Sequence, residues 1–136
     1  MSLNRKISFH LVDDNDIDIA VNTKLLQLMG LTDTIYTYGG GLKFLEELKQ
    51  LGEKFNSQHN IILLDIMMPM ANGFDCLEQL QQLSEGDKKR IDVFMLSSTI
   101  DRNDIMRAEG YPMVRKVLEK PLDIYLLKRC IEEMYP

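Results

Sequence analysis

Five short apolar runs separated by helix-like segments constrain the fold of this chain more than any other feature of its sequence. They recur at intervals of roughly 20 to 30 residues, at Ile7 to Val12, Thr34 to Tyr38, Asn60 to Leu64, Asp92 to Leu96 and Val114 to Leu118. Runs of this length and composition predict β-strands. A run that is apolar throughout, such as Ile61 to Leu64, suits a parallel sheet that is covered on both faces.

The segments between these runs carry apolar residues at helical spacing. In the first, Ile17, Val21, Leu25 and Leu28 step by four, four and three, which predicts an amphipathic helix that ends at Gly30. Comparable stripes span Leu42 to Phe55, Phe74 to Leu83 and Leu122 to Met134, and a shorter, more polar one spans Asp101 to Glu109. Strict alternation of strand and helix predicts parallel βαβ units, and therefore an α/β fold with five strands and five helices.

Length and charge limit the classes of protein to which the chain can belong. Its 136 residues predict a single domain over residues 1–136, with a core from about residue 6 to about residue 134 and no effector domain. The formal net charge of −5 has the wrong sign for a protein that gains affinity by neutralising nucleic-acid phosphates. The apolar runs are far shorter than the roughly 18 residues that cross a bilayer. With two isolated cysteines, Cys76 and Cys130, we predict a cytoplasmic protein without direct nucleic-acid binding or membrane insertion.

Three aspartates lie at the ends of two predicted strands. Asp13 and Asp14 close the first run and Asp65 closes the third. In the five-stranded doubly wound order 2-1-3-4-5 (flavodoxin-like), the carboxyl ends of these two strands flank the binding crevice. Carboxylates that meet there repel one another, so the cluster needs a proton or a cation, and Mg²⁺ is the hard ion that fits best. The alternative is that Asp13 and Asp14 only cap the first helix.

Two further polar residues lie at the same edge of the predicted sheet. Ser97 ends the fourth run, and Lys120 ends the fifth and is followed by Pro121, which restricts the backbone of the lysine and can form a cis bond. The lysine could form a simple ion pair. A cation, an ammonium and a hydroxyl around one carboxylate could also stabilise phosphoryl oxygens, with Asp65 as the nucleophile that forms an aspartyl phosphate.

Four motifs in order resemble the receiver (CheY-like) domain of two-component response regulators. They are Leu11-Val12-Asp13-Asp14, then Leu64-Asp65-Ile66-Met67-Met68-Pro69 with Gly73 following, then Met95-Leu96-Ser97, and finally Glu119-Lys120-Pro121. The resemblance extends from about Lys6 to Met134. It implies a phosphorylation-controlled protein of two-component signalling.

The resemblance also implies a role for each matching residue. Asp65 would accept a phosphoryl group from a sensor histidine kinase or a histidine phosphotransfer protein. Asp14 would bind Mg²⁺ directly and Asp13 largely through water, and the backbone carbonyl of Met67 would complete the metal site with Asp65. These assignments follow from the matching positions in the family.

The hydroxyl of Ser97 would turn toward the phosphoryl group, and Lys120 would contact its oxygens. One departure concerns Val117, three residues before the lysine, where the family often has Tyr or Phe. Valine is stiff at χ1 and carries no ring that could move with the hydroxyl. This departure does not change the expectation of phosphorylation. It does put in doubt whether the signal passes through the fourth helix, fifth strand and fifth helix, as it usually does in the family.

The leading hypothesis is a stand-alone receiver that signals by altered contacts with an unknown output protein, as a diffusible output or a phosphorelay intermediate. It would be a phosphoacceptor switch, with self-phosphorylation and slow self-dephosphorylation, and no enzyme in the ordinary turnover sense. An Asp-x-Asp phosphatase of the haloacid dehalogenase type is disfavoured, because Met67 occupies the position of the second acid. The remaining alternative is a receiver-fold interaction module that is not phosphorylated.

Overall fold

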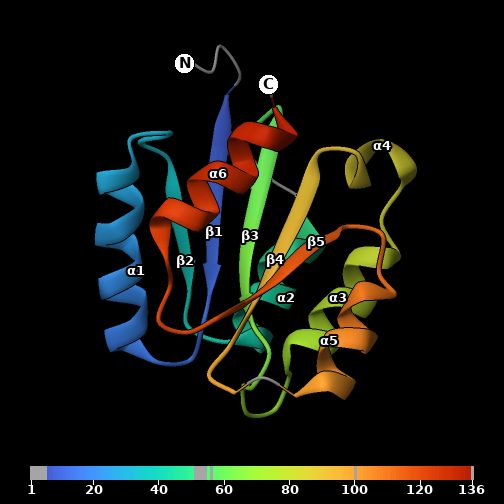
Figure 1. The fold of residues 1–136 in the computed structure, drawn as a ribbon. Coiled ribbons are helices and arrows are strands. Elements are labelled where there is room, and N and C mark those ends of the chain that lie inside the picture. The colour runs from blue at the N-terminus through green and yellow to red at the C-terminus, as the bar shows by residue number, and fades with distance from the viewer. Residues whose placement is uncertain (1–5, 51–54, 56, 100, 136) are drawn as a thin grey trace.

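The computed structural model describes residues 6–50, 55, 57–99 and 101–135, and its centre is a five-stranded parallel sheet (Figure 1). The strands are β1 (Ile7–Val12), β2 (Ile35–Tyr38), β3 (His59–Asp65), β4 (Ile91–Ser97) and β5 (Val114–Glu119). Each end lies within one residue of the predicted run. The order β2-β1-β3-β4-β5 confirms the predicted doubly wound α/β architecture.

Six helices are described where the sequence analysis predicts five. They are α1 (Asp16–Met29), α2 (Gly41–Gln50), α3 (Gly73–Gln81), α4 (Glu85–Lys88), α5 (Arg102–Glu109) and α6 (Ile124–Met134). Residues 51–54, which the prediction includes in the second helix, lie outside the described residues. The additional helix, α4, has four residues and is capped by the Ser84 side chain, which accepts a hydrogen bond from the Asp87 amide. It is too short to carry a periodic apolar stripe, so periodicity alone does not detect it.

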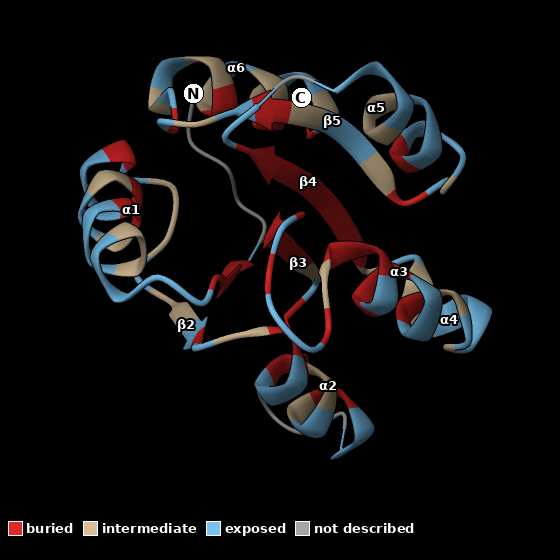
Figure 2. Cartoon of the chain, turned by 90° about the horizontal axis from the view of Figure 1, so that it is seen from below, coloured by how far each residue is buried: buried red, intermediate tan, exposed pale blue. Residues whose placement is uncertain are grey.

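The helices cover both faces of the sheet, as a sheet of apolar strands requires (Figure 2). Every residue of β4 is buried, and so is every residue of β3 after His59. Alternate side chains of β3 enter different clusters: Ile61 and Leu63 pack with α1 and α6, whereas Ile62 and Leu64 pack with α2, α3 and α5. Within the described ranges, no helix has the length and apolar character needed to cross a bilayer.

Helix α1 buries a different face from the one that the sequence analysis predicts. The buried residues are Asn22, Leu26 and Met29. Of the predicted stripe, Leu25 packs against the core from a half-buried position, whereas Ile17, Val21 and Leu28 are 73%, 51% and 74% exposed. The expectation that this stripe forms the inner face is therefore wrong. The helix is rotated so that residues 18, 22, 26 and 29 share the side that faces the protein.

A matched pair of leucines in α1 tests this orientation. Leu26 is fully buried and Leu28 is 74% exposed, so Leu26→Ala should lower the free energy of unfolding by about 2–5 kcal/mol. The same change at Leu28 should stay within about 0.5 kcal/mol, because it removes little buried surface. Urea unfolding of the two variants measures both values. A larger loss for Leu28→Ala would contradict the orientation described here.

Candidate functional site

The register of the central strands brings three aspartates together at the carboxyl edge of the sheet. Val12 of β1 lies opposite Leu64 of β3, so Asp13, which follows β1, lies close to Asp65, the last residue of β3. Carboxylate oxygens of Asp13, Asp14 and Asp65 all lie within 4.8 Å of one another. Asp13 and Asp65 are buried, and Asp14 is exposed. The predicted acidic cluster is therefore present, with one side open to solvent.

Helix capping does not account for the paired aspartates. The N-cap of α1 is Asn15, whose side chain accepts hydrogen bonds from the amides of Ile17 (2.9 Å) and Asp18 (3.1 Å). Asp13 instead accepts one hydrogen bond from the Asn15 amide through Oδ1, at 2.9 Å. Its second oxygen, Oδ2, accepts a hydrogen bond from the Lys120 ammonium. The alternative that Asp13 and Asp14 serve only as caps is therefore wrong.

Lys120 supplies a positive charge to the cluster. Its Nζ lies 3.0 Å from Asp13 Oδ2, 3.1 Å from Asp18 Oδ2 and 3.3 Å from Asp65 Oδ2. The backbone amide of Lys120 donates to the Ser97 carbonyl at 2.8 Å, and the bond between Lys120 and Pro121 is cis. The predicted lysine thus contacts both buried aspartates, and it also contacts Asp18.

The environment shifts the pKa of both central groups. Burial raises the pKa of the Asp65 carboxyl from 3.8 to about 6, although Lys120 acts in the opposite direction and Asp13 adds a smaller increase. A carboxyl with this pKa is mostly ionised at neutral pH. Burial lowers the pKa of the Lys120 ammonium, but its hydrogen bonds to Asp13 and Asp18 and the charge of Asp65 outweigh this, so the net shift is upward. Lys120 therefore stays charged, and Asp65 is available as a nucleophile.

The loop that follows Asp65 is held close to the carboxylate. The backbone amide of Met67 donates to the Asp65 side chain, and the Met67 side chain is 68% exposed. The role of the Met67 carbonyl as a metal ligand stays a prediction. Gly73, the first residue of α3, is needed here because a Cβ would lie 2.7 Å from the Asp65 carbonyl oxygen and 3.0 Å from the Ile66 Cα.

Ser97 lies at the predicted edge, with its hydroxyl bonded to neighbouring backbone. It is buried at the end of β4, and its Oγ donates to the Thr99 carbonyl and accepts from the Thr99 amide at 3.3 Å. If this hydroxyl turned toward a phosphoryl group, it would give up its bonds to Thr99 for a bond to a phosphoryl oxygen. This movement stays a prediction. Val117 is half-buried on β5 and packs against the cluster on the side of α2, α3 and α5.

The sequence analysis missed Asp18. A signal for it does exist, because Asp18, Asn22, Leu26 and Met29 recur at steps of four, four and three, in phase with the buried face of α1. This row competes with the more apolar row that begins at Ile17. An acidic residue in the first turn of the helix, on its inner face, lies at the same edge of the sheet as Asp13.

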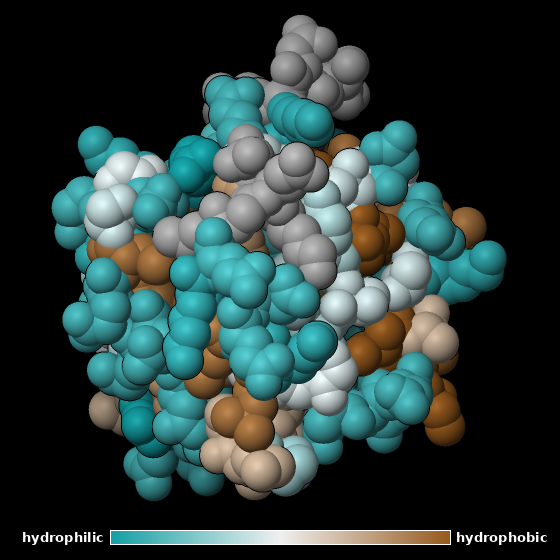
Figure 3. All heavy atoms as spheres, turned by 180° about the vertical axis from the view of Figure 1, so that it is seen from behind, coloured by the Kyte–Doolittle hydropathy of each residue, from teal (hydrophilic) through white to brown (hydrophobic). Residues whose placement is uncertain are grey.

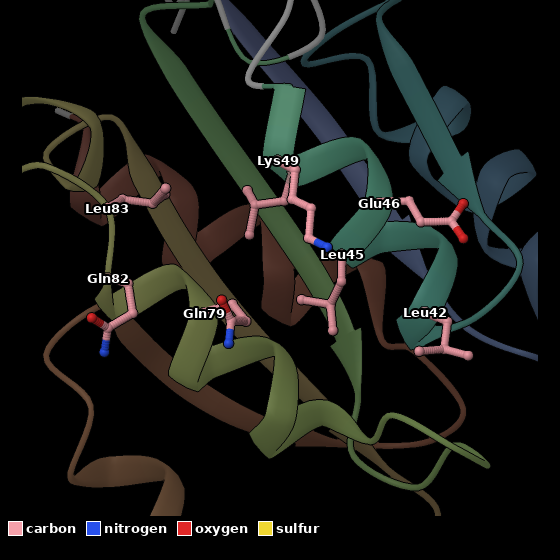
Figure 4. Close-up of a pocket in the computed structure, with 8 residues that line it drawn as sticks. Leu42, Leu45, Glu46, Lys49, Gln79, Gln82 and Leu83 are labelled. Atoms are coloured by element: carbon pink, nitrogen blue, oxygen red, sulfur yellow. The ribbon is translucent and has the colours of Figure 1, made fainter.

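A separate apolar hollow of about 510 Å³ lies between α2 and α3. Seen from behind, the surface is mainly hydrophilic, with hydrophobic side chains in separate patches (Figure 3). The hollow is lined by Leu42, Leu45, Glu46, Leu48, Lys49, Gln79, Gln82 and Leu83 (Figure 4). None of the predicted site residues is among them, so it is distinct from the acidic crevice.

Comparison with known proteins identifies a matching family and several similar proteins. The family model described as response regulator receiver domain matches residues 9–132. The chain is 27% identical over 124 residues to the probable methanogenesis regulatory protein FilR2 of Methanothrix harundinacea, covering 91% of this chain and 78% of that protein. It is 30% identical over 97 residues to the response regulator Rcp1 of Synechocystis, covering 71% of this chain and 65% of that protein.

A solved structure resembles the chain over almost its whole length. It is a response regulator receiver protein from Dyadobacter fermentans, with 35% sequence identity and a TM-score of 0.84. The alignment covers 96% of this chain and 98% of that one. The fold likeness therefore extends over nearly every described element.

Proposed function

Because this chain belongs to the response regulator receiver family of two-component systems, we propose that it accepts a phosphoryl group on Asp65 and signals through altered contacts with another protein. The observation that carries this proposal is the arrangement around Asp65. The carboxylate is buried and mostly ionised at neutral pH, and the Lys120 ammonium lies 3.3 Å from its Oδ2. The carboxylates of Asp13 and Asp14 lie beside it.

Transfer of a phosphoryl group to Asp65 requires mainly that the carboxylate is held in position and that positive charge stabilises the phosphoryl oxygens. An oxygen of Asp65 attacks the phosphorus of a phosphohistidine, the phosphorus–nitrogen bond breaks, and its electron pair remains on the donor imidazole. Lys120 offers positive charge to the phosphoryl oxygens. The Ser97 hydroxyl would add a hydrogen bond after leaving Thr99. The donor would be a sensor histidine kinase or a histidine phosphotransfer protein.

The acidic cluster fits a magnesium ion, which receiver domains generally bind at an acidic pocket. Mg²⁺ prefers oxygen ligands, and Asp13, Asp14 and Asp65 each offer one within a 4.8 Å span. The carboxylates of Asp13, Asp14, Asp18 and Asp65 beside one ammonium leave negative charge that a divalent cation would largely offset. The Met67 carbonyl would add a fourth protein oxygen. The bound ion would supply positive charge to the phosphoryl oxygens during transfer.

The protein would act as a switch with limited chemistry of its own. No second acid stands two residues after Asp65, where Met67 lies with its side chain exposed. Rapid turnover of a phosphorylated substrate would need a general acid there. The output would be a contact between a surface of this protein and another protein. The partner determines which surface is used.

Labelling with acetyl phosphate tests the proposal. Incubation with acetyl phosphate and Mg²⁺ should add the mass of one phosphoryl group, measured on the intact protein, because Asp65 can displace acetate from the phosphorus. EDTA should prevent the gain by removing the ion. A known receiver treated in parallel shows that the reagent is active. No gain in this chain, while the known receiver labels, would favour an interaction module that is not phosphorylated, or a receiver that takes its phosphoryl group strictly from a cognate kinase.

A further inference from the structure

The Lys120 ammonium is shared by three carboxylates, and one of them belongs to none of the receiver motifs. We propose that Asp18 is a positioning residue that holds Lys120 on the α1 side of the crevice and competes for it with a phosphoryl group on Asp65. This inference rests on the proposed function. It assigns to Asp18 a regulatory effect on phosphoryl uptake.

The ammonium contacts all three carboxylates at similar distances. Nζ lies 3.0 Å from Asp13 Oδ2 and 3.1 Å from Asp18 Oδ2, and both contacts are hydrogen bonds. Asp65 Oδ2 is the most distant of the three, at 3.3 Å. A lysine ammonium has three N–H donors. Asp18 therefore occupies a donor that could otherwise turn toward a phosphoryl oxygen.

The difference in exposure identifies Asp18 as the partner that can release the lysine. Its side chain is 40% exposed, whereas those of Asp13 and Asp65 are 6% and 8% exposed. A carboxylate that loses an ion pair while buried keeps an uncompensated charge, but one that reaches solvent regains hydration. Exchange of Asp18 for a phosphoryl group at Lys120 is therefore the least costly rearrangement of this cluster.

Local structure keeps Asp18 in place as a competitor. Its amide donates to the Asn15 side chain at 3.1 Å, which ties it to the first turn of α1. The positive end of the helix dipole also favours a carboxylate at this position. Asp18 is thus fixed on the helix, and Lys120 is the group that moves between partners.

The consequence is a change in phosphoryl affinity when the carboxylate is removed. Asp18→Asn keeps the size and an oxygen acceptor but removes the charge that attracts Lys120. A partly exposed ion pair of this kind corresponds to roughly twofold to fivefold in an equilibrium constant. Asp18→Asn should therefore bind beryllofluoride, a phosphoryl analogue, roughly twofold to fivefold more tightly at saturating Mg²⁺, and should label faster with acetyl phosphate by a similar factor.

The matched control is Asp16→Asn, which removes the same charge from the same helical turn. Asp16 is exposed and is not among the three carboxylates that contact Lys120. NMR titration with beryllofluoride, intact mass after acetyl phosphate, and thermal unfolding are measured on the full chain and both variants. Asp16→Asn should match the unaltered protein in affinity and labelling rate. Asp18→Ser serves as a second variant at the position if Asp18→Asn unfolds.

Each outcome bears on one proposal. Tighter beryllofluoride binding by Asp18→Asn alone, with thermal unfolding showing that the variant is folded, supports competition for Lys120. An equal gain in Asp16→Asn would reduce the effect to general charge and overturn the inference. Unchanged or weaker binding by Asp18→Asn would also overturn it, while labelling of the unaltered protein would leave the proposed function standing. If the unaltered protein takes up no phosphoryl group, the proposed function fails and the inference fails with it.

Discussion

Replacing Asp65 with asparagine should abolish phosphoryl uptake and, at neutral pH, make the metal-free protein more stable. The loss of labelling follows because the amide cannot act as the nucleophile. The gain in stability follows because the Asp65 carboxylate is buried beside Asp13. Asparagine removes that buried charge and leaves Asp13 and Asp18 to share Lys120.

The direction of the pH dependence follows from the raised pKa. Burial raises the pKa of Asp65 from 3.8 to about 6 in the folded state, so between these values the folded protein binds more protons than the unfolded chain. Stability from this group is therefore lost as the pH rises through that window. Above it the penalty is complete, at about 3 kcal/mol for two pKa units. Asp65→Asn lacks this carboxyl and so does not carry the penalty. The difference in free energy of unfolding between the variant and the unaltered protein should therefore disappear below about pH 4.

Urea unfolding in EDTA, from pH 3.5 to 8, measures this difference. The matched control is Asp92→Asn, at another buried aspartate, whose carboxylate is 2.5 Å from Arg115 Nε and also accepts a hydrogen bond from the Tyr135 hydroxyl. Loss of the ion pair with Arg115 and a weaker hydrogen bond from Tyr135 should destabilise the protein by about 1–3 kcal/mol at neutral pH. Equal destabilisation by Asp65→Asn would contradict the raised pKa. Mg²⁺ should stabilise the unaltered protein far more than Asp65→Asn.

Gly41→Ala should destabilise the fold more than any other single methyl addition in the turn from β2 to α2. A Cβ at Gly41 would lie 2.1 Å from the Ala71 carbonyl oxygen and 2.9 Å from its carbon. Both are backbone atoms of the loop that follows Asp65, so neither can move aside alone. Overpacking against backbone should cost about 3 kcal/mol.

Gly39→Ala is the control in the same turn. A Cβ at Gly39 would meet nothing within 4 Å, so this variant should differ from the unaltered protein by less than about 0.5 kcal/mol. Urea unfolding measures both variants, and acetyl phosphate labelling at a temperature where each is folded shows whether the loop still presents Asp65. Equal stability of the two variants would mean that the two loops do not touch as described.

The strands could be predicted from the sequence because each depends on a short, local pattern, and the order and the crevice follow from the doubly wound arrangement of alternating strands and helices. Apolar runs such as Ile61 to Leu64 specify a strand buried on both faces. Once parallel order is established, the residues that end each strand must meet at one edge, so Asp13, Asp65 and Lys120 are brought together by topology. The family resemblance adds roles for these residues, and the geometry of the cluster is compatible with them.

The rotation of α1 could not be predicted because the helix carries two interleaved rows. The row that begins at Ile17 is more apolar, whereas the row that begins at Asp18 is the buried one. The choice between them depends on contacts made elsewhere in the fold. One of these contacts is the ion pair between Asp18 and Lys120, two residues that are 102 positions apart in the sequence. The bonds between Ser97 and Thr99 likewise depend on the loop geometry after β4.

The positions of the strands give the two halves of the site different resistance to local opening. Asp13 follows β1 and Asp65 ends β3, and both strands are paired on both sides, whereas Lys120 follows β5, an edge strand that pairs only with β4. Amide hydrogens on interior strands exchange with solvent mainly through global unfolding, and those of edge elements exchange through smaller openings. An opening confined to β5 would withdraw the ammonium while the carboxylates stay together. The aspartates and the lysine are therefore held by parts of the sheet that differ in their resistance to local opening.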